Sequence, residues 1–148
     1  MKRAALMACA LLAGAALAQL PAPQAQPTCP DALAVERQHL LGLWRAEFEG
    51  GVPRGATLLL EAHPEGALGL RGAINRNGER NQLAGDLGDG EINLEESADG
   101  LRISAVWIGE VVDGSCGNEI RGAWQADGAA QQFQFVLRKL QDGANRFP

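Results

Sequence analysis

Residues able to do acid, base or nucleophilic chemistry are scarce in this chain of 148 residues, which contains two histidines and three cysteines. A hydrolytic triad needs a nucleophile, a base and an orienting group held close together. His39 and His63 are the available bases, and neither lies in a Gly-x-Ser-x-Gly or similar frame. Two isolated histidines also make a poor zinc site. We therefore expect surface roles for both histidines, no bound metal, no cofactor and no enzymatic activity.

The acidic residues add no catalytic pair. The stretch from Asp86 to Glu91 is similar in composition to a calcium loop, but its glycines and acids are out of register with one, so we interpret it as a solvated hairpin. Glu95 and Glu96 are adjacent in a predicted strand, where neighbouring side chains face opposite sides. A basic cluster surrounds the Asn77-Gly78 turn and is interpreted as solvated, with contact to an anion or a partner as the alternative. Its members are Arg71, Arg76 and Arg80.

The beginning of the chain predicts export. The basic residues Lys2 and Arg3 precede an apolar run over residues 4–18, a pattern typical of a secretory signal peptide that is cleaved after Ala18. The alternatives are an uncleaved anchor, or lipid attachment at Cys9 in a lipobox-like Leu-Met-Ala-Cys stretch. We expect a periplasmic or secreted protein with no integral membrane span in the mature chain.

Composition divides the rest of the chain into three parts. Residues 19–27 are rich in proline and glutamine and predict a disordered tether. Residues 28–140 form a single predicted domain, followed by a loose tail over residues 141–148. Loss of the signal leaves 11 basic residues against 18 acidic ones, a formal charge of −7. This balance disfavours nucleic acid and anionic lipid as partners and favours cationic ones.

After cleavage the remaining cysteines are Cys29 and Cys116. Because export places them in an oxidising compartment, we predict a disulfide between them, with two free thiols as the alternative. The bond would anchor the loop over residues 109–118, which is longer than the other predicted turns. Long, anchored loops often carry recognition.

Apolar and polar residues alternate with a period of two after Gly42, which predicts strands. Turns such as Asn77-Gly78 and Asp89-Gly90 separate them at spacings that suit hairpins. The fold prediction is an antiparallel up-and-down barrel of about eight strands after one short helix, Pro30 to Leu41, with a two-sheet sandwich as the alternative. The strands are expected over residues 44–48, 56–62, 68–74, 83–87, 92–94, 101–107, 120–124 and 133–137.

The sequence Gly42-Leu43-Trp44, placed after a short helix and at the start of the first strand, resembles the calycin group of lipocalins, avidins and fatty-acid-binding proteins. The resemblance implies a barrel in which Trp44 closes one end. It also implies that a basic residue late in the last strand, Arg138 or Lys139, packs across this tryptophan. Biotin binding is not implied, because the chain has no tyrosine.

Two functional hypotheses follow. In the first, the barrel encloses a small, largely apolar ligand between Trp107, Trp124 and Phe135, which fall on the predicted inner face. In the alternative, the barrel is filled, and the chain is an envelope protein-binding module, such as a lysozyme-type inhibitor, acting through its loops, chiefly residues 109–118. The acidic balance suits a basic target.

Overall fold

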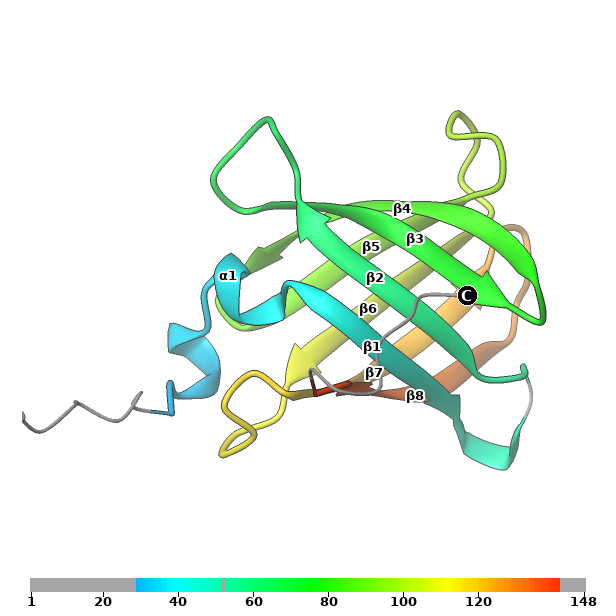
Figure 1. Cartoon of the computed structure of the whole chain (residues 1–148). Helices are drawn as coiled ribbons and strands as arrows, with labels where there is room; N and C mark the ends of the chain where they lie inside the picture. Colours follow the sequence, from blue (N-terminus) through cyan, green and yellow to red (C-terminus); the bar gives the residue numbers. More distant parts are fainter. Residues whose placement is uncertain (1–28, 52, 142–148) are drawn as a thin grey trace, which may run out of the picture.

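The computed structural model describes residues 29–51 and 53–141. The predicted signal peptide, Cys9, the tether and the tail from residue 142 lie outside the described residues. Eight antiparallel strands form one closed barrel in which each strand pairs with its neighbours in chain order (Figure 1). The strands are β1 Gly42–Phe48, β2 Ala56–Ala62, β3 Gly69–Arg76, β4 Glu79–Gly88, β5 Glu91–Ser97, β6 Ala105–Val111, β7 Glu119–Ala126 and β8 Gln132–Lys139. The predicted barrel is confirmed.

Alternation and turn chemistry explain why these segments form hairpins. In β5, for example, Ile92 and Leu94 are buried while Glu91 and Asn93 are exposed. Asn77-Gly78 and Asp89-Gly90 each adopt two successive positive φ angles, which are the conformations of the two-residue turns that match strand twist. Pairing of β1 with β8 closes the sheet and removes its edges.

A short helical segment precedes the barrel, as predicted, but it is not one continuous helix from Pro30 to Leu41. Two short elements occupy this segment: η1, a 3-10 turn over Ala32–Ala34, and α1 over Arg37–Leu40. Val35 and Glu36 between them have extended backbone angles, which breaks the helix. Leu33, in the 3-10 turn, is 77% exposed.

The predicted strand over residues 101–107 also begins too early, because β6 starts at Ala105. The Asp99 carboxylate accepts hydrogen bonds from the backbone N–H groups of Leu101 and Arg102, which holds residues 99–102 in a turn. Leu101 and Ile103 are consequently exposed in a loop instead of lying on the inner face.

The two ends of the barrel differ. We call the end with α1, the β4–β5 turn and the β6–β7 loop the capped end; the elements η1 and α1 lie across it in Figure 1. The far end carries the Asn77-Gly78 turn and the β5–β6 loop. Between β6 and β7, a Cβ atom on Gly122 would collide with the backbone of Ile108, so a residue with a side chain does not fit there. Among the described residues, no helix has the length and apolarity to cross a membrane.

Candidate functional site

The interior of the barrel is occupied by an aromatic cluster. Trp107 packs edge-on against Phe135 with ring centroids 4.9 Å apart, and lies 6.3 Å from Trp124 and 5.5 Å from Phe48. Trp124 in turn lies 6.0 Å from Phe133. These separations are typical of direct ring contact in a protein core. The three residues of the predicted ligand site, Trp107, Trp124 and Phe135, are therefore brought together by β6, β7 and β8.

The space between these rings is filled by the rings themselves. A void large enough for one water would leave part of its lining accessible, yet Trp107 is 0% exposed and Phe135 is 1% exposed. Trp124 and Phe133, nearer the far end, are half-buried. An eight-stranded barrel is just wide enough for side chains to fill it or for one small ligand, and here side chains fill it around Trp107.

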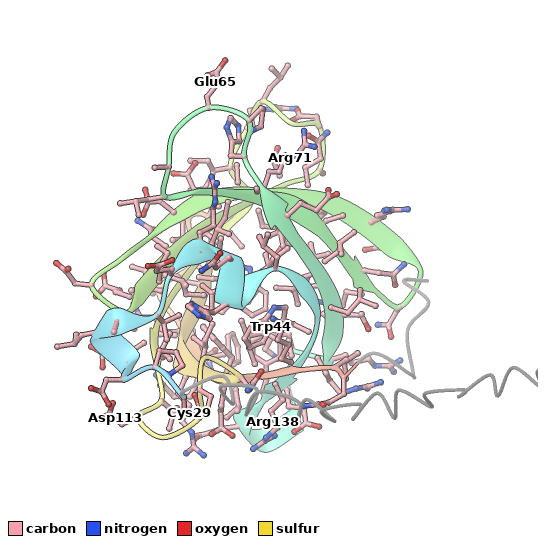
Figure 2. The ribbon with its side chains drawn as sticks, turned by 60° about the vertical axis from the view of Figure 1, so that its left-hand side comes forward. Cys29, Trp44, Glu65, Arg71, Asp113 and Arg138 are labelled. Carbon is pink, nitrogen blue, oxygen red and sulfur yellow. A yellow bond between two sulfur atoms is a disulfide. The ribbon has the colours of Figure 1, made fainter. Side chains whose placement is uncertain are left out.

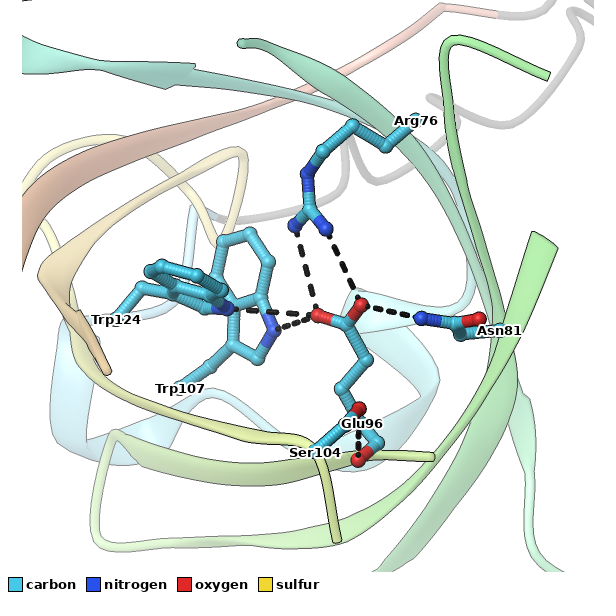
Figure 3. A network of polar contacts seen from close by, with 6 residues as sticks. All are labelled: Arg76, Asn81, Glu96, Ser104, Trp107 and Trp124. Atoms are coloured by element: carbon cyan, nitrogen blue, oxygen red, sulfur yellow. Dashed lines mark hydrogen bonds and ion pairs between the residues drawn. The ribbon is translucent and has the colours of Figure 1, made fainter. Parts of the chain in front are cut away.

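A polar network lies beside the aromatic cluster, centred on Glu96, whose side chain is 2% exposed (Figure 3). Its carboxylate accepts hydrogen bonds from Asn81 Nδ2 at 2.7 Å and from the indole N–H groups of Trp107 and Trp124 at 3.3 and 3.4 Å. Arg76 completes the network with an ion pair to the same carboxylate at 3.2 Å. The guanidinium of Arg76 also lies 5.4 Å from the Trp124 ring centroid.

This network offsets the desolvation cost of burying the Glu96 carboxylate, because the charge is paired and both oxygens are hydrogen-bonded. It was missed at the level of sequence, where Arg76 was interpreted as part of a solvated cluster; that interpretation is wrong for Arg76. The alternation of the two strands would have placed Glu96 and Arg76 inside the barrel. Glu96 continues the inward phase of Ile92 and Leu94, and Arg76 continues that of Leu70 and Ile74.

At the capped end, Trp44 is fully buried and points into the barrel (Figure 2). Its indole N–H donates to the carbonyl of Leu40 at 2.8 Å, which ties α1 to the barrel. The ammonium of Lys139 lies 5.9 Å from the Trp44 ring centroid and donates to the carbonyl of His39. Of the two basic residues at the end of β8, Lys139 is therefore the one that packs against Trp44. Arg138 points outward and pairs with Glu47 and Glu119.

A disulfide between Cys29 and Cys116 joins the start of the domain to the β6–β7 loop, as predicted. Such bonds are typical of proteins in oxidising compartments outside the cytoplasm. Further contacts hold the same loop: the N–H of Ala32 donates to Asp113 Oδ1 at 3.2 Å, and the N–H of Val111 donates to the Gly90 carbonyl at 2.8 Å. Figure 2 shows Cys29 and Asp113 close together at this end. The loop is thus braced against η1 and the β4–β5 turn.

The braced elements enclose a groove at the surface of the capped end, open to solvent and about 820 Å³ in volume. We call it the acidic groove. It is lined by Ala32 and Leu33, residues 88–91, residues 110–113 and Arg121. Four of these residues are acidic, namely Asp89, Glu91, Glu110 and Asp113. Exposed Leu33 lies at its rim.

The charge of Arg121, the basic residue lining the groove, is already compensated. Its guanidinium donates to Glu119 Oε1 at 2.7 Å. This hydrogen bond, together with the nearby charge of Arg138, lowers the pKa of Glu119 below its ordinary value. Within residues 29–51 and 53–141, no ion pair reaches the four groove carboxylates. The four carboxylates outnumber the one arginine in the lining, so the groove carries a net negative charge.

The loop at the far end is ordered by one carboxylate. Hydrogen bonds from the backbone N–H groups of Arg102 and Leu101, followed by the Arg102 side chain, lower the pKa of Asp99 to about 2. The loop presents Leu101, which is 89% exposed. This side chain provides an exposed apolar residue at the opposite end from Leu33.

Both histidines have local structural contacts. His39 Nδ1 accepts the N–H of Glu36 and caps α1, and His63 Nδ1 contacts the backbone of Glu65. In the part of the chain that the structure describes, no three potential metal ligands converge. No protein-family model matches the chain, and no curated protein matches its sequence.

Proposed function

We propose that this chain is an exported, non-enzymatic barrel that binds a protein partner through the loops of its capped end, in the manner of an inhibitor of an envelope enzyme such as a lysozyme. Export rests on the signal-peptide pattern of residues 1–18 and agrees with the disulfide. Cleavage after Ala18 would place the mature protein in the periplasm or outside the cell.

The observation that carries the proposal is the contrast between the barrel interior and its capped end. The interior around Trp107 is filled, whereas the capped end has a groove of about 820 Å³ with an exposed leucine at its rim. A protein surface that is held rigid before binding loses less conformational entropy on association. The disulfide and the Ala32–Asp113 hydrogen bond supply this rigidity.

The test is binding and inhibition with a panel of purified secreted enzymes, including lysozymes of several classes and cationic peptidases. The groove variant is Leu33→Arg, and the matched control is Leu101→Arg, which makes the same charge change at an exposed leucine of the far end. We expect the groove variant to weaken binding at least about tenfold and the control to leave it within about twofold. Absence of binding across the panel, or loss in the control alone, contradicts the proposal.

Enclosure of a small, largely apolar ligand between Trp107, Trp124 and Phe135 is the second candidate. The half-buried rings of Trp124 and Phe133 near the far end favour it, because they are the part of the cluster that a ligand reaches first. Binding would require the rings to separate. Indole fluorescence that changes saturably with one member of a lipid and metabolite panel would support enclosure, and constant fluorescence across the panel would contradict it.

A further inference from the structure

The negative charges of the acidic groove are arranged in a way that costs stability without a counter-ion. Glu91 of β5 is directly opposite Glu110 of β6 in the strand register, and both side chains are exposed. On its other side Glu110 is opposite Arg121 of β7, whose guanidinium donates to Glu119. Like charges directly opposite one another on neighbouring strands repel. Asp89 and Asp113 add two more carboxylates within the same groove. A bound cation would relieve this repulsion.

The distribution of the carboxylates selects the kind of cation. In the described residues no three acidic, histidine or cysteine side chains converge as a metal ion would require. The charges are instead spread over the β4–β5 turn, the end of β6 and the following loop. A series of separated carboxylates along a groove suits lysine or arginine side chains carried on an extended chain, and the guanidinium fork matches carboxylate geometry best.

The apolar part of the groove adds a second requirement. Leu33 is 77% exposed at the rim, and Ala32, Val111 and Val112 line the groove beside it. The cost of leaving a leucine side chain in water is recovered when a partner covers it. An apolar residue next to the cationic one in the partner would provide that cover.

We propose that the acidic groove binds an extended cationic segment of a protein, with an arginine or lysine side chain between Glu91 and Glu110 and an apolar neighbour against Leu33. This inference rests on the proposed function and specifies the partner's chemistry. Association is steered by the negative field of the groove, so it weakens as salt screens the charges.

The experiment measures fluorescence anisotropy of a labelled ten-residue peptide that carries three arginines with leucine or glycine between them. Its twin replaces each arginine with neutral citrulline. The groove variant is Glu91→Gln with Glu110→Gln. The matched control is Glu61→Gln with Glu79→Gln, which removes the same charge at two exposed glutamates outside the groove. All four substituted side chains are exposed, so the barrel should fold in both variants.

We expect the groove variant to bind the arginine peptide about tenfold more weakly and the control within about twofold of the unsubstituted protein. The citrulline peptide should bind at least about tenfold more weakly, and raising the salt from about 0.05 to 0.5 M should weaken the arginine peptide similarly. Equal losses in the two variants, or equal affinity for the citrulline peptide, would overturn the inference. Concentration-dependent dimerisation through the groove would overturn it as well.

The same variants separate this inference from the proposed function. Suppose that a protein partner binds Leu33→Arg more weakly, but binds the Glu91→Gln, Glu110→Gln variant as tightly as the unsubstituted chain. The proposal of a cationic segment is then wrong, while the proposal of partner binding at the capped end still holds. If no protein partner binds the unsubstituted chain and the arginine peptide does not bind it either, both proposals fail.

Discussion

Removal of the disulfide is the sharpest perturbation of the capped end. Replacing both cysteines, Cys29→Ser with Cys116→Ser, cuts a cross-link between residues 87 positions apart. For a closed loop of that length, the loop-entropy model gives a destabilisation of about 4.6 kcal/mol at 25 °C. This figure applies if the native state keeps every other contact.

The structure shows why the measured loss should be smaller. Element η1 contains no buried residue, and the first buried side chain after Cys29 is Val35. Without the cross-link, residues 29–34 are held by the hydrogen bond between the Ala32 N–H and Asp113 and by the packing of half-buried Ala32 against the core. Fraying of this segment recovers conformational entropy, and the hydrogen bond and packing that it breaks cancel part of that gain. We therefore expect a net loss of about 2–4 kcal/mol.

Urea unfolding measures this loss, because all three tryptophans lie in the barrel strands and their fluorescence reports on the barrel. Hydrogen exchange of the Ala32 amide measures the fraying. Reduction of the unsubstituted protein should reproduce the serine variant, which serves as the control for the substitutions themselves. A domain of this size retains positive stability after the loss, so the barrel should remain folded.

A loss below about 1 kcal/mol, with the Ala32 amide still protected, would refute this reasoning. It would mean that non-covalent contacts hold η1 against the β6–β7 loop. A serine variant that does not fold at all would refute it from the other side, since the barrel would then depend on the cross-link. In the expected case, the folded variant also loses affinity for a groove partner, because η1, which lines one side of the groove, is frayed.

The remaining predictions concern charges inside and outside the barrel. Arg76→Met should lower the free energy of unfolding in urea by about 3–5 kcal/mol, because it leaves the buried Glu96 carboxylate without its counter-charge. Adding Glu96→Leu should restore much of that stability. A decrease below about 1 kcal/mol for Arg76→Met alone would count against the network. The pKa of Asp99 is lowered from 3.8 to about 2, so the hydrogen bonds of its carboxylate stabilise the loop above pH 3.8 and are lost as the pH falls through about 2. The amide signal of Leu101 should therefore titrate with a midpoint near pH 2. A midpoint near pH 4 would contradict the assigned hydrogen bonds. Glu91→Gln should stabilise the unbound protein by about 0.2–1 kcal/mol, because Glu91 faces Glu110 across the strand pair. In a Glu110→Gln background the same change should gain less, and an equal gain in both backgrounds would show that the pair does not interact.

Strand number, hairpin order and barrel closure were predictable from sequence because each strand buries one face and each turn has residues suited to it. Trp44, Ile92 and Phe135 lie inside as their phase requires. The helix was mispredicted because apolar periodicity over residues 30–41 does not reveal the extended angles at Val35 and Glu36. Tertiary contacts of the loop and the disulfide overrode the local preference.

The candidate sites were predictable only in part. The Cys29–Cys116 bond and the importance of the loop over residues 109–118 followed from cysteine usage and loop length. The Glu96 network did not, because charged residues were assigned to the surface by type although their phase pointed inward. The groove depends on η1 lying beside the β4–β5 turn, a contact between segments almost sixty residues apart that no local pattern contains.

We propose that this barrel acts at its capped end and not through its interior. Amide and indole resonances, recorded while an unlabelled basic lysozyme or the arginine peptide is added to the isotope-labelled protein, test it most directly. We predict shifts concentrated at residues 88–91 and 110–113, with the indole N–H signals of Trp107 and Trp124 unmoved, because Glu96 and the packed rings hold them. Shifts of these indole signals, with the groove amides unchanged, would show that the ligand binds in the interior and not at the capped end.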